Sequence, residues 1–288
     1  MGRTARGLLA FALAAAGAAP TAARAQVVAA TAPPPAPVPR WDPDRVNQVD
    51  ANTARLIGAR RIKLGVLSFD LGLTKWLSIG TDPPAWAVRA VRSPIVPNLH
   101  VKLAFLRTDF LAVSGQVAGY YADISTDNAS GQLVSVPLTL YATIPMGTRT
   151  WLHLEGAYNW LRAIGAGDQT QAEIRGSVVA RTAQVGAMFE VRVSRVVSLL
   201  ARGRYQVAMS PIVFSGGGAV DAYTTVQLDA QVRPSVEHPA MGIAAIACTW
   251  SHVGFIAGGG YGHYFVPGAN IALAYQGFVP EASLWAVF

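Results

Sequence analysis

His153 and Glu155 lie two residues apart in the segment Trp151–Trp160 and are the side chains of this sequence best suited to acid–base chemistry. Residues at this spacing project from the same face of a β-strand, so the imidazole and the carboxylate would lie side by side. Tyr141 is expected to face Glu155 from a neighbouring strand. An imidazole supported in this way can act as a general base on water or on a hydroxyl group. The three side chains are therefore the candidate site of a hydrolase.

Catalysis at this position lacks a nucleophile. No serine lies near His153 in the sequence, and the other inward candidate, His263, has no acid close to it. Hydrolysis needs a nucleophile and a base within hydrogen-bonding reach of each other. Most histidines on the polar face of a strand are ordinary wall residues. We therefore assign no catalytic residue and keep an enzyme that hydrolyses lipids or peptides as the alternative function.

Metal and nucleotide sites find no support in the residue spacing. Cys248 is the single cysteine, so no internal disulfide is possible, and no histidine or cysteine cluster has ligand spacing. The triplets Gly216–Gly218 and Gly258–Gly260 lack the strand, helix and lysine context of a phosphate-binding loop. They fit a loop tip and a closely packed wall, respectively. We expect no cofactor and no metal.

The composition is apolar without long apolar runs. Hydrophobic residues make up 52% of the chain and charged residues 14%, and the mean hydropathy is +0.32. The longest uncharged segment, His238–Pro280, contains Gly258–Gly260, Pro239 and Pro267, which fit a transmembrane helix poorly. The apolar residues must therefore follow another pattern.

That pattern is alternation with a period of two. It occurs in Asn98–Leu106, Leu133–Ile144, Trp151–Trp160 and Val196–Met209, and it predicts strands with one polar and one apolar face. The polar faces would line the interior of an all-β structure. The predicted interior residues are His100, Lys102, Tyr141, Thr143, His153, Glu155, Gln184, Glu190, Arg192, Arg202, Arg204 and Gln206.

Short and long connections alternate between these segments. The short ones lie near 70–75, 107–109, 147–149, 194–195 and 251–252, and the longer polar ones at 123–131, 163–173 and 215–238. The segments are about ten residues or longer, which suits a tilted strand that crosses a membrane. Outer-membrane barrels have tight periplasmic turns and longer outer loops. The order therefore favours an antiparallel transmembrane β-barrel with an up-and-down meander over a soluble sandwich.

Aromatic residues recur at matching heights on the apolar faces. Tyr121, Trp160, Tyr205 and Tyr261 each stand about nine to eleven residues above a short turn, the length of a membrane-crossing strand. Phe105, Phe189 and Phe255 lie near the short turns, as does the terminal Phe288. We expect the two sets to form the outer and inner aromatic girdles of the barrel.

The N-terminus has the three regions of a secretory signal peptide. Arg3 and Arg6 precede the apolar run Leu8–Ala19, and Ala23 and Ala25 supply the small residues before a cleavage site at Gln26. Removal of residues 1–25 leaves 288 − 25 = 263 residues and a net charge of 20 − 16 = +4. Without a basic cluster, this excess indicates no nucleic-acid partner. Residues 26–44, which include Pro33–Pro35, fit a stiff periplasmic linker that could contact a periplasmic partner.

The last eight residues, Glu281–Phe288 (EASLWAVF), are expected to form a terminal strand. Counted back from the end, every second position is apolar: Phe288, Ala286, Leu284, Ala282 and, just before this stretch, Pro280. This ending resembles the C-terminal signature of bacterial outer-membrane β-barrel proteins, in which a terminal Phe follows apolar residues at every second position. The resemblance implies recognition of this strand by the barrel-assembly machinery. Leu284 and Phe288 would face lipid, and Glu281, Ser283 and Trp285 would face inward. Because Pro280 cannot donate a ladder hydrogen bond, we expect the paired strand to start after it.

Strand direction gives the strand number. Inward strands are expected near 61–70, 98–107, 131–146, 176–193 and 239–250, and outward strands near 75–82, 110–122, 150–162, 196–213 and 252–265. With the terminal strand these make eleven, but bacterial barrels close with even numbers. We therefore predict twelve strands within a barrel domain of residues 45–288, with the missing strand in 45–58, and keep ten as the alternative.

Two segments do not fit this arrangement. Thr224–Arg233 alternates well although it lies where an outer loop is expected, so it could be a strand that extends above the membrane. Asp42–Arg60 could be a short helix, with Pro43 in its first turn, that fills the lumen or contacts periplasmic partners.

The predicted function is that of an outer-membrane barrel that forms a pore or has a structural role. An excess of Arg and Lys on the inner wall would favour anions if the lumen is open. These charges would instead pair and fill the lumen if it is closed, with Glu190 near Arg202 across the short turn at Ser194. A barrel of this size lies between filled and water-filled examples, so both possibilities stay open.

Overall fold

The computed structural model describes residues 49, 52–83, 98–126, 129–169, 172–210, 212–219, 225–232, 238–266 and 271–288. The expected signal peptide (1–25) and periplasmic linker (26–44) lie outside the described residues. Among the described residues, no helix is long and apolar enough to cross a membrane.

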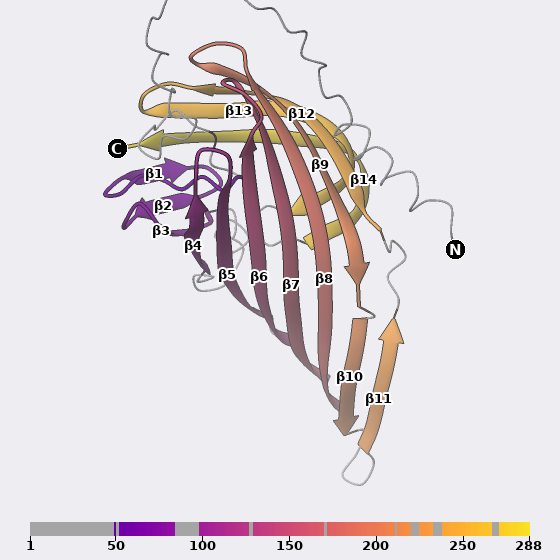
Figure 1. The fold of residues 1–288 in the computed structure, drawn as a ribbon. Coiled ribbons are helices and arrows are strands. Elements are labelled where there is room, and N and C mark those ends of the chain that lie inside the picture. The colour runs from indigo at the N-terminus through magenta and orange to yellow at the C-terminus, as the bar shows by residue number, and fades with distance from the viewer. Residues whose placement is uncertain are drawn as a thin grey trace, which may run out of the picture. The chain divides into compact units, whose positions relative to one another are not determined.

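Twelve of the fourteen strands in the described part of the chain close into one antiparallel β-barrel (Figure 1). Each strand pairs with its neighbour in an up-and-down meander, and β14 pairs with β1 to complete the ring. The predicted fold class and strand number are therefore confirmed. The ring strands are β1 (Ile62–Gly65), β2 (Phe69–Gly72), β3 (Leu77–Thr81), β4 (Asn98–Arg107), β5 (Ala112–Thr126), β6 (Ala129–Pro145), β7 (Thr150–Gln169), β8 (Ala172–Arg192), β9 (Val197–Met209), β12 (Ala240–Thr249), β13 (Val253–Val266) and β14 (Ile271–Val287).

The other two strands, β10 (Ile212–Ala219) and β11 (Thr225–Val232), form a hairpin that prolongs one side of the barrel (Figure 1). β8 pairs first with β9, up to Thr182↔Met209, and then with β10, from Val179↔Val213 onward. The expectation of an extending strand at Thr224–Arg233 is thus confirmed by β11. The expectation that Gly216–Gly218 form a loop tip is wrong, because these residues pair within β10.

Short connections gather at one end of the ring, which we call the turn rim. They are closed by backbone hydrogen bonds such as Thr108 N to Leu111 O and Trp250 N to Val253 O. The terminal Phe288 lies at the same end, paired with Ile62. The five connections are 73–76, 108–111, 146–149, 193–196 and 250–252.

At the opposite end, the far rim, the strands are longer than the sequence suggested. Asp123 pairs with Gln132 and Ala163 pairs with Val178, so the expected loops at 123–131 and 163–173 are almost entirely strand. Only 127–128 and 170–171 separate the strands of these two hairpins. Polar side chains beyond an apolar band favour a loop interpretation, but they do not prevent backbone pairing.

The side of the barrel formed by β1, β2 and β3 is much shorter than the rest (Figure 1). The chain reverses directly after Gly65, whose amide donates to Ser68 O at 2.9 Å. The expectation of one inward strand at 61–70 is therefore wrong, because this range holds the outward β1 and part of the inward β2. β1 is the twelfth strand, and the proposal to find it in 45–58 is also wrong.

The two faces of the wall have the distribution of a membrane barrel. Large apolar side chains such as Leu140 and Leu154 are exposed on the outside, whereas Glu155, Glu190 and Gln206 are buried on the inside. A soluble protein rarely exposes a continuous apolar surface of this kind. A closed antiparallel barrel with an apolar outer face is the architecture of outer-membrane β-barrels, in agreement with the resemblance of the terminal strand.

The predicted girdle residues all carry outward side chains. Tyr121, Tyr261, Phe105 and Phe189 are exposed, and Trp160, Tyr205 and Phe255 are partly exposed. Their contact with lipid stays a prediction. Tyr158 is also exposed, on the apolar parity that the alternation predicts. Further exposed aromatic residues that the sequence analysis did not single out are Trp76, Phe110, Trp250, Tyr275 and Phe278.

Close packing of β12 against β13 depends on glycine. A side-chain carbon at Gly258 would meet the backbone of Ala244 and Ala245, and one at Gly260 would meet the backbone of Gly242. This confirms the interpretation of the second glycine triplet as a closely packed wall.

β14 has a free side that we call the open edge. It begins at Ile271 and includes Pro280, so the expectation that the strand starts after Pro280 is wrong. The backbone groups of Leu284 and Phe288 point toward β1, and Pro280 has the same parity. The nitrogen of Pro280, which carries no hydrogen, therefore faces the β1 side of the strand. On that side, residues 271–283 have no strand partner in the described residues. An unpaired edge is where a strand tolerates proline.

Candidate functional site

A short stretch of chain before β1 fills part of the lumen. We call Val49 together with Asn52–Gly58 the lumen segment. Thr53, Ala54 and Arg55 in it are almost fully buried although they belong to no strand or helix. Local hydrogen bonds hold it in a compact turn, since Thr53 Oγ1 and Arg55 Nη1 both donate to Val49 O. Of the two expectations for this region, the filling of the lumen is thus found, without a helix in its described part.

Three strands of the wall bind this segment. Lys102 Nζ on β4 donates to Thr53 O at 2.8 Å, and Ala54 N donates to Thr143 Oγ1 on β6 at 3.0 Å. Arg55 Nη1 pairs with Glu190 Oε2 on β8 at 2.8 Å. Because both backbone and side-chain groups take part, the segment is fixed in position and in orientation across the lumen.

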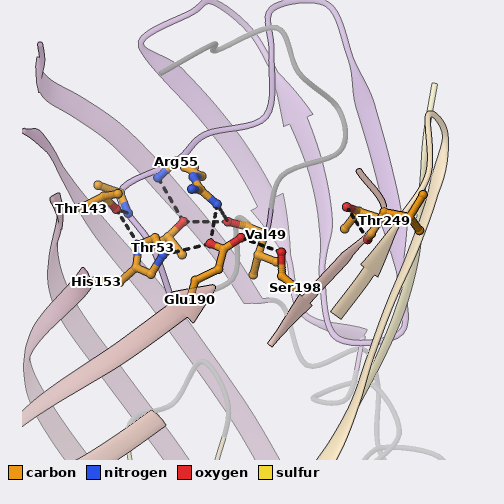
Figure 2. A network of polar contacts seen from close by, with 10 residues as sticks. Val49, Thr53, Arg55, Thr143, His153, Glu190, Ser198 and Thr249 are labelled. Atoms are coloured by element: carbon orange, nitrogen blue, oxygen red, sulfur yellow. Dashed lines mark hydrogen bonds and ion pairs between the residues drawn. The ribbon is translucent and has the colours of Figure 1, made fainter. Parts of the chain in front are cut away.

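Glu190 is the centre of a buried polar network (Figure 2). Its Oε2 binds Arg55 and lies 3.1 Å from His153 Nε2, and its Oε1 accepts from Ser198 Oγ at 3.1 Å. Thr143 Oγ1 lies 2.9 Å from His153 Nδ1. With Nε2–H donating to Glu190 and the Thr143 hydroxyl donating to Nδ1, both ring nitrogens of His153 have a partner. The network joins the lumen segment to the wall.

The hydrolase candidate is not assembled. His153 binds Thr143 and Glu190, whereas Glu155 pairs with Arg204 at 2.6 Å. Tyr141 does lie opposite Glu155 in the ladder, as expected. The His153 side chain is fully buried and both ring nitrogens are occupied, so it has no free position for a substrate or for a catalytic water.

A second polar cluster lies behind the short strands. His100 on β4 contacts Asp70 on β2 through Nε2 at 2.7 Å, and its Nδ1 lies 3.4 Å from Asp82 Oδ1. Asp70 also accepts from Ser68 at 2.7 Å and lies 3.6 Å from Lys63 Nζ. These contacts hold the low wall of β1–β3 to the long strand β4. No group of three or more His, Cys, Asp or Glu residues in the described ranges has the geometry of a metal site.

A third cluster joins β9 to the opposite strands. Arg202 pairs with Glu281 on β14, and Arg204 contacts both Glu155 and Asn52 of the lumen segment. Glu190 and Arg202 are near each other in the ladder, as expected, since Arg202 lies opposite Met188. They do not pair with each other, because Glu190 binds Arg55 and Arg202 binds Glu281. The more general expectation, that charges pair across the lumen, is confirmed.

The predicted interior residues all belong to the inner face. Ten are buried there: His100, Lys102, Tyr141, Thr143, His153, Glu155, Gln184, Glu190, Arg204 and Gln206. Arg202 is slightly less buried, and Arg192 lies close to the turn rim, where its guanidinium stacks on the inward-facing Trp151 at 5.3 Å. Lys102 lies over the Tyr141 ring at 4.8 Å. These placements agree with the alternation from which the residues were predicted.

Several functional residues escaped the sequence analysis. Arg55 lies in a segment expected to be a strand, and Asp70 and Asp82 flank turns in which acidic residues are unremarkable. Their importance follows from contacts over long sequence distances, such as 135 residues between Arg55 and Glu190. The inward parity of Glu281 was the available signal for its partner role.

The inner wall has two chemically different halves. Strands β2 to β8 present the charged and polar residues described above. Strands β12, β13 and β14 instead present a buried apolar cluster that includes Met241, Ile243, Ile256, Phe265 and Val279. This half corresponds to the uncharged stretch His238–Pro280, whose lack of charge therefore extends to both faces of the wall.

Two cavities flank the lumen segment. One, of about 140 Å³, lies among Arg55, Lys63, Asp70, His100 and Tyr141 on the polar side. The other, of about 120 Å³, lies against the apolar half and is described below. Asn52 lines both cavities, so the segment separates two spaces.

Comparison with known proteins places the fold in context. No protein-family model matches this chain, and no curated protein matches its sequence. Among solved structures, the chain is similar to the translocator domain of the autotransporter NalP from Neisseria meningitidis, with 10% identity, a TM-score of 0.45, and coverage of 79% of this chain and 85% of that one. It is also similar to CdiB from Escherichia coli, with 9% identity, a TM-score of 0.30, and coverage of 79% of this chain and 62% of that one.

Proposed function

We propose that this protein is an outer-membrane barrel that its own lumen segment keeps closed, and that it passes solute only when the segment leaves the lumen. The apolar outer face and the aromatic residues on it support the membrane location. In this proposal residues 1–25 direct export, and the terminal strand with Leu284 and Phe288 is the part that the assembly machinery recognises. Residues 26–44 would lie in the periplasm and could contact a partner there.

One observation carries the proposal: Thr53, Ala54 and Arg55 are bonded to β4, β6 and β8 at the same time. A permanently open pore would have solvent at these positions. A purely structural barrel could fill its lumen with wall side chains, as small barrels do. Here a segment outside the ring fills the space, and it can leave without breaking any strand pairing.

The lumen would accept small polar solutes once the segment has left. Within the described part of the chain, its cations are Lys63, Lys102, Arg192, Arg202 and Arg204, and its carboxylates are Asp70, Asp82, Glu155, Glu190 and Glu281. These charges balance, so in this proposal the lumen has a mixed lining in place of the excess of Arg and Lys expected from the sequence. We expect weak selectivity between anions and cations, because a single sign of charge is needed for strong selectivity.

Planar-bilayer recording tests the proposal. The wild-type protein should be silent for most of the recording. Arg55→Glu places a second carboxylate against buried Glu190, and an uncompensated buried charge of this kind should expel the segment. We expect at least a tenfold longer open time in this variant.

Arg195→Glu is the matched control, because it makes the same charge change at an exposed turn residue. Folding of each variant is checked by its heat-dependent gel shift. If folded Arg55→Glu and a variant lacking residues 49–58 both stay as silent as wild type, the closed-channel proposal is wrong and a structural role is favoured.

A further inference from the structure

We propose that the lumen holds a binding site for a long-chain fatty acid along the apolar half of its wall, reached sideways through the open edge of β14. This site lies beyond the closure described above. It rests on the proposed membrane location, since the ligand would arrive from the surrounding lipid.

The apolar half of the wall calls for an apolar occupant. Met241, Ile243, Ile256, Phe265 and Val279 face the interior of a barrel whose other half is polar. Val49 of the lumen segment covers only the lower part of this surface, near Ile243 and Ile256. The upper part, with Met241, Phe265 and Val279, lines a cavity that Ile243 and Ile256 also border.

That cavity has a volume of about 120 Å³. A water molecule needs roughly 10–15 Å³ by the same measure, so the space is large enough for several waters or for part of a hydrocarbon chain. Apolar cavities stay dry and bind apolar molecules in preference to water. With Met241, Phe265 and Val279 on its wall, the upper part of this cavity favours hydrocarbon.

The cavity reaches the outside of the barrel at the open edge. Val279 and Glu281 face inward, whereas Pro280 and Ala282 are exposed on the outer face, yet all four line the same cavity. Residues of both parities therefore border the cavity along this part of β14, where the strand has no strand partner on its β1 side in the described residues. Leu67, in the turn between β1 and β2, forms the opposite border. The low wall of β1–β3 therefore leaves a passage beside β14 in the described residues.

The outer surface next to this passage is apolar. Phe278 and Leu284, which share the outward parity of the same strand, are exposed. An acyl chain in the membrane could move from this surface past Pro280 to the apolar part of the inner wall, beside the Arg202–Glu281 ion pair. The small volume admits a single chain, which excludes a two-chain phospholipid from the cavity.

A carboxylate head fits the polar end of the cavity. Arg202, Arg204 and Asn52 line it. Each guanidinium has five N–H donors, and the partners found for them are Glu281 for Arg202, and Glu155 and Asn52 for Arg204. Donors therefore remain for the oxygens of a bound carboxylate, and hydrogen bonds from a cationic donor to a carboxylate are strong ones.

Photo-crosslinking tests the site. A fatty acid that carries a diazirine in its chain is incubated with the full-length protein in lipid nanodiscs and irradiated, and adducts are located by mass spectrometry. Residues 278 and 279 point to opposite sides of the wall, so the position of the adducts is decisive. We expect adducts on Met241, Phe265 and Val279, in addition to those on the outer aromatics.

Val279→Asn should reduce the inner adducts at least fivefold, because it places an amide in the apolar wall. Met241→Gln provides a second variant in case the first folds poorly. Ala157→Asn is the matched control, since it introduces the same amide on the polar half of the inner face. Labelling of Phe278 and Leu284 without inner adducts would overturn the site but leave the membrane location intact. Absence of labelling on the outer face would contradict the membrane location itself.

Competition identifies the head group. Excess unlabelled fatty acid should remove the inner adducts, whereas a long-chain alcohol of equal length should compete at least fivefold less well. Equal competition by the alcohol would contradict the assignment of the carboxylate to Arg202 and Arg204.

Discussion

Arg55 Nη1 lies 2.8 Å from Glu190 Oε2, and the side chains of both residues are almost completely buried. The contact joins the lumen segment to the wall strand that also supports the β10–β11 hairpin. A buried ion pair contributes little net stability when it is compared with an apolar pair of similar volume, but the loss of one partner is costly. The pair therefore fixes the position of the lumen segment against the wall.

Replacement of Arg55 by an uncharged residue should measure the cost of losing one partner of the ion pair. Arg55→Met leaves Glu190 buried with fewer partners, and we expect a loss of about 3–5 kcal/mol in the free energy of unfolding. The double variant Arg55→Met/Glu190→Met should recover most of it, because no charge is left unpaired. Urea unfolding in lipid vesicles measures both values. If the effects of the two single substitutions on the free energy of unfolding were additive, the proposed role of the pair in fixing the segment would be contradicted.

His153 should have a structural role. His153→Ala removes a partner from Thr143 and from Glu190, and leaving buried polar groups unsatisfied costs about 1–3 kcal/mol. His252→Ala, at an exposed turn residue, should be neutral by the same unfolding measurement. A lipid or peptide hydrolase activity that disappears in His153→Ala, with unfolding unchanged, would restore the enzymatic alternative.

The outer face should respond to charge according to depth. Leu140→Arg, in the middle of β6, should lower the free energy of unfolding from lipid by about 2–4 kcal/mol, the range found for Arg at the bilayer midplane. Phe110→Arg, at the turn rim, should cost about 0–1 kcal/mol. Both side chains are well exposed, at 60% and 66%. Equal small effects at the two sites would indicate that the surface does not contact hydrocarbon.

The terminal residue should matter for assembly. Phe288 and Ile62 exchange two backbone hydrogen bonds, of 2.9 and 3.0 Å, where the ring closes. Deletion of Phe288 removes these bonds and the outward aromatic side chain, so we expect several-fold less folded barrel in the membrane fraction. Deletion of the hairpin Ile212–Val232 should have a smaller effect because the ring stays intact. Wild-type levels of the Phe288-deleted protein would refute the prediction.

Local patterns explain what the sequence analysis predicted correctly. Alternation assigns residues such as His100, Glu155 and Arg204 to the inner face because side-chain direction depends only on parity along the strand. Strand ends near tight turns were also close to the observed ones; β4 (Asn98–Arg107) matches its predicted range.

Long-range relationships could not be predicted in this way. Nothing near Arg55 in the sequence specifies Glu190 as its partner, because that contact depends on the register of the whole ring. The turn at Val66–Ser68 has no glycine, asparagine or proline to mark it, so β1 and β2 were taken as one strand. The far rim shows the reverse error: its polar residues are of the kind common in loops, so they were interpreted as loops although their backbones are paired in strands.

The position of the seam between β1 and β14 has a consequence for the order of folding events. The lumen segment is joined to β1 by a few residues, and β1 closes the ring with Phe288. The segment can therefore settle against β4, β6 and β8 while the ring is still an open sheet, and the last pairing then wraps the wall around it. No chain end has to be threaded through a finished barrel, in keeping with the rarity of threaded connections in proteins.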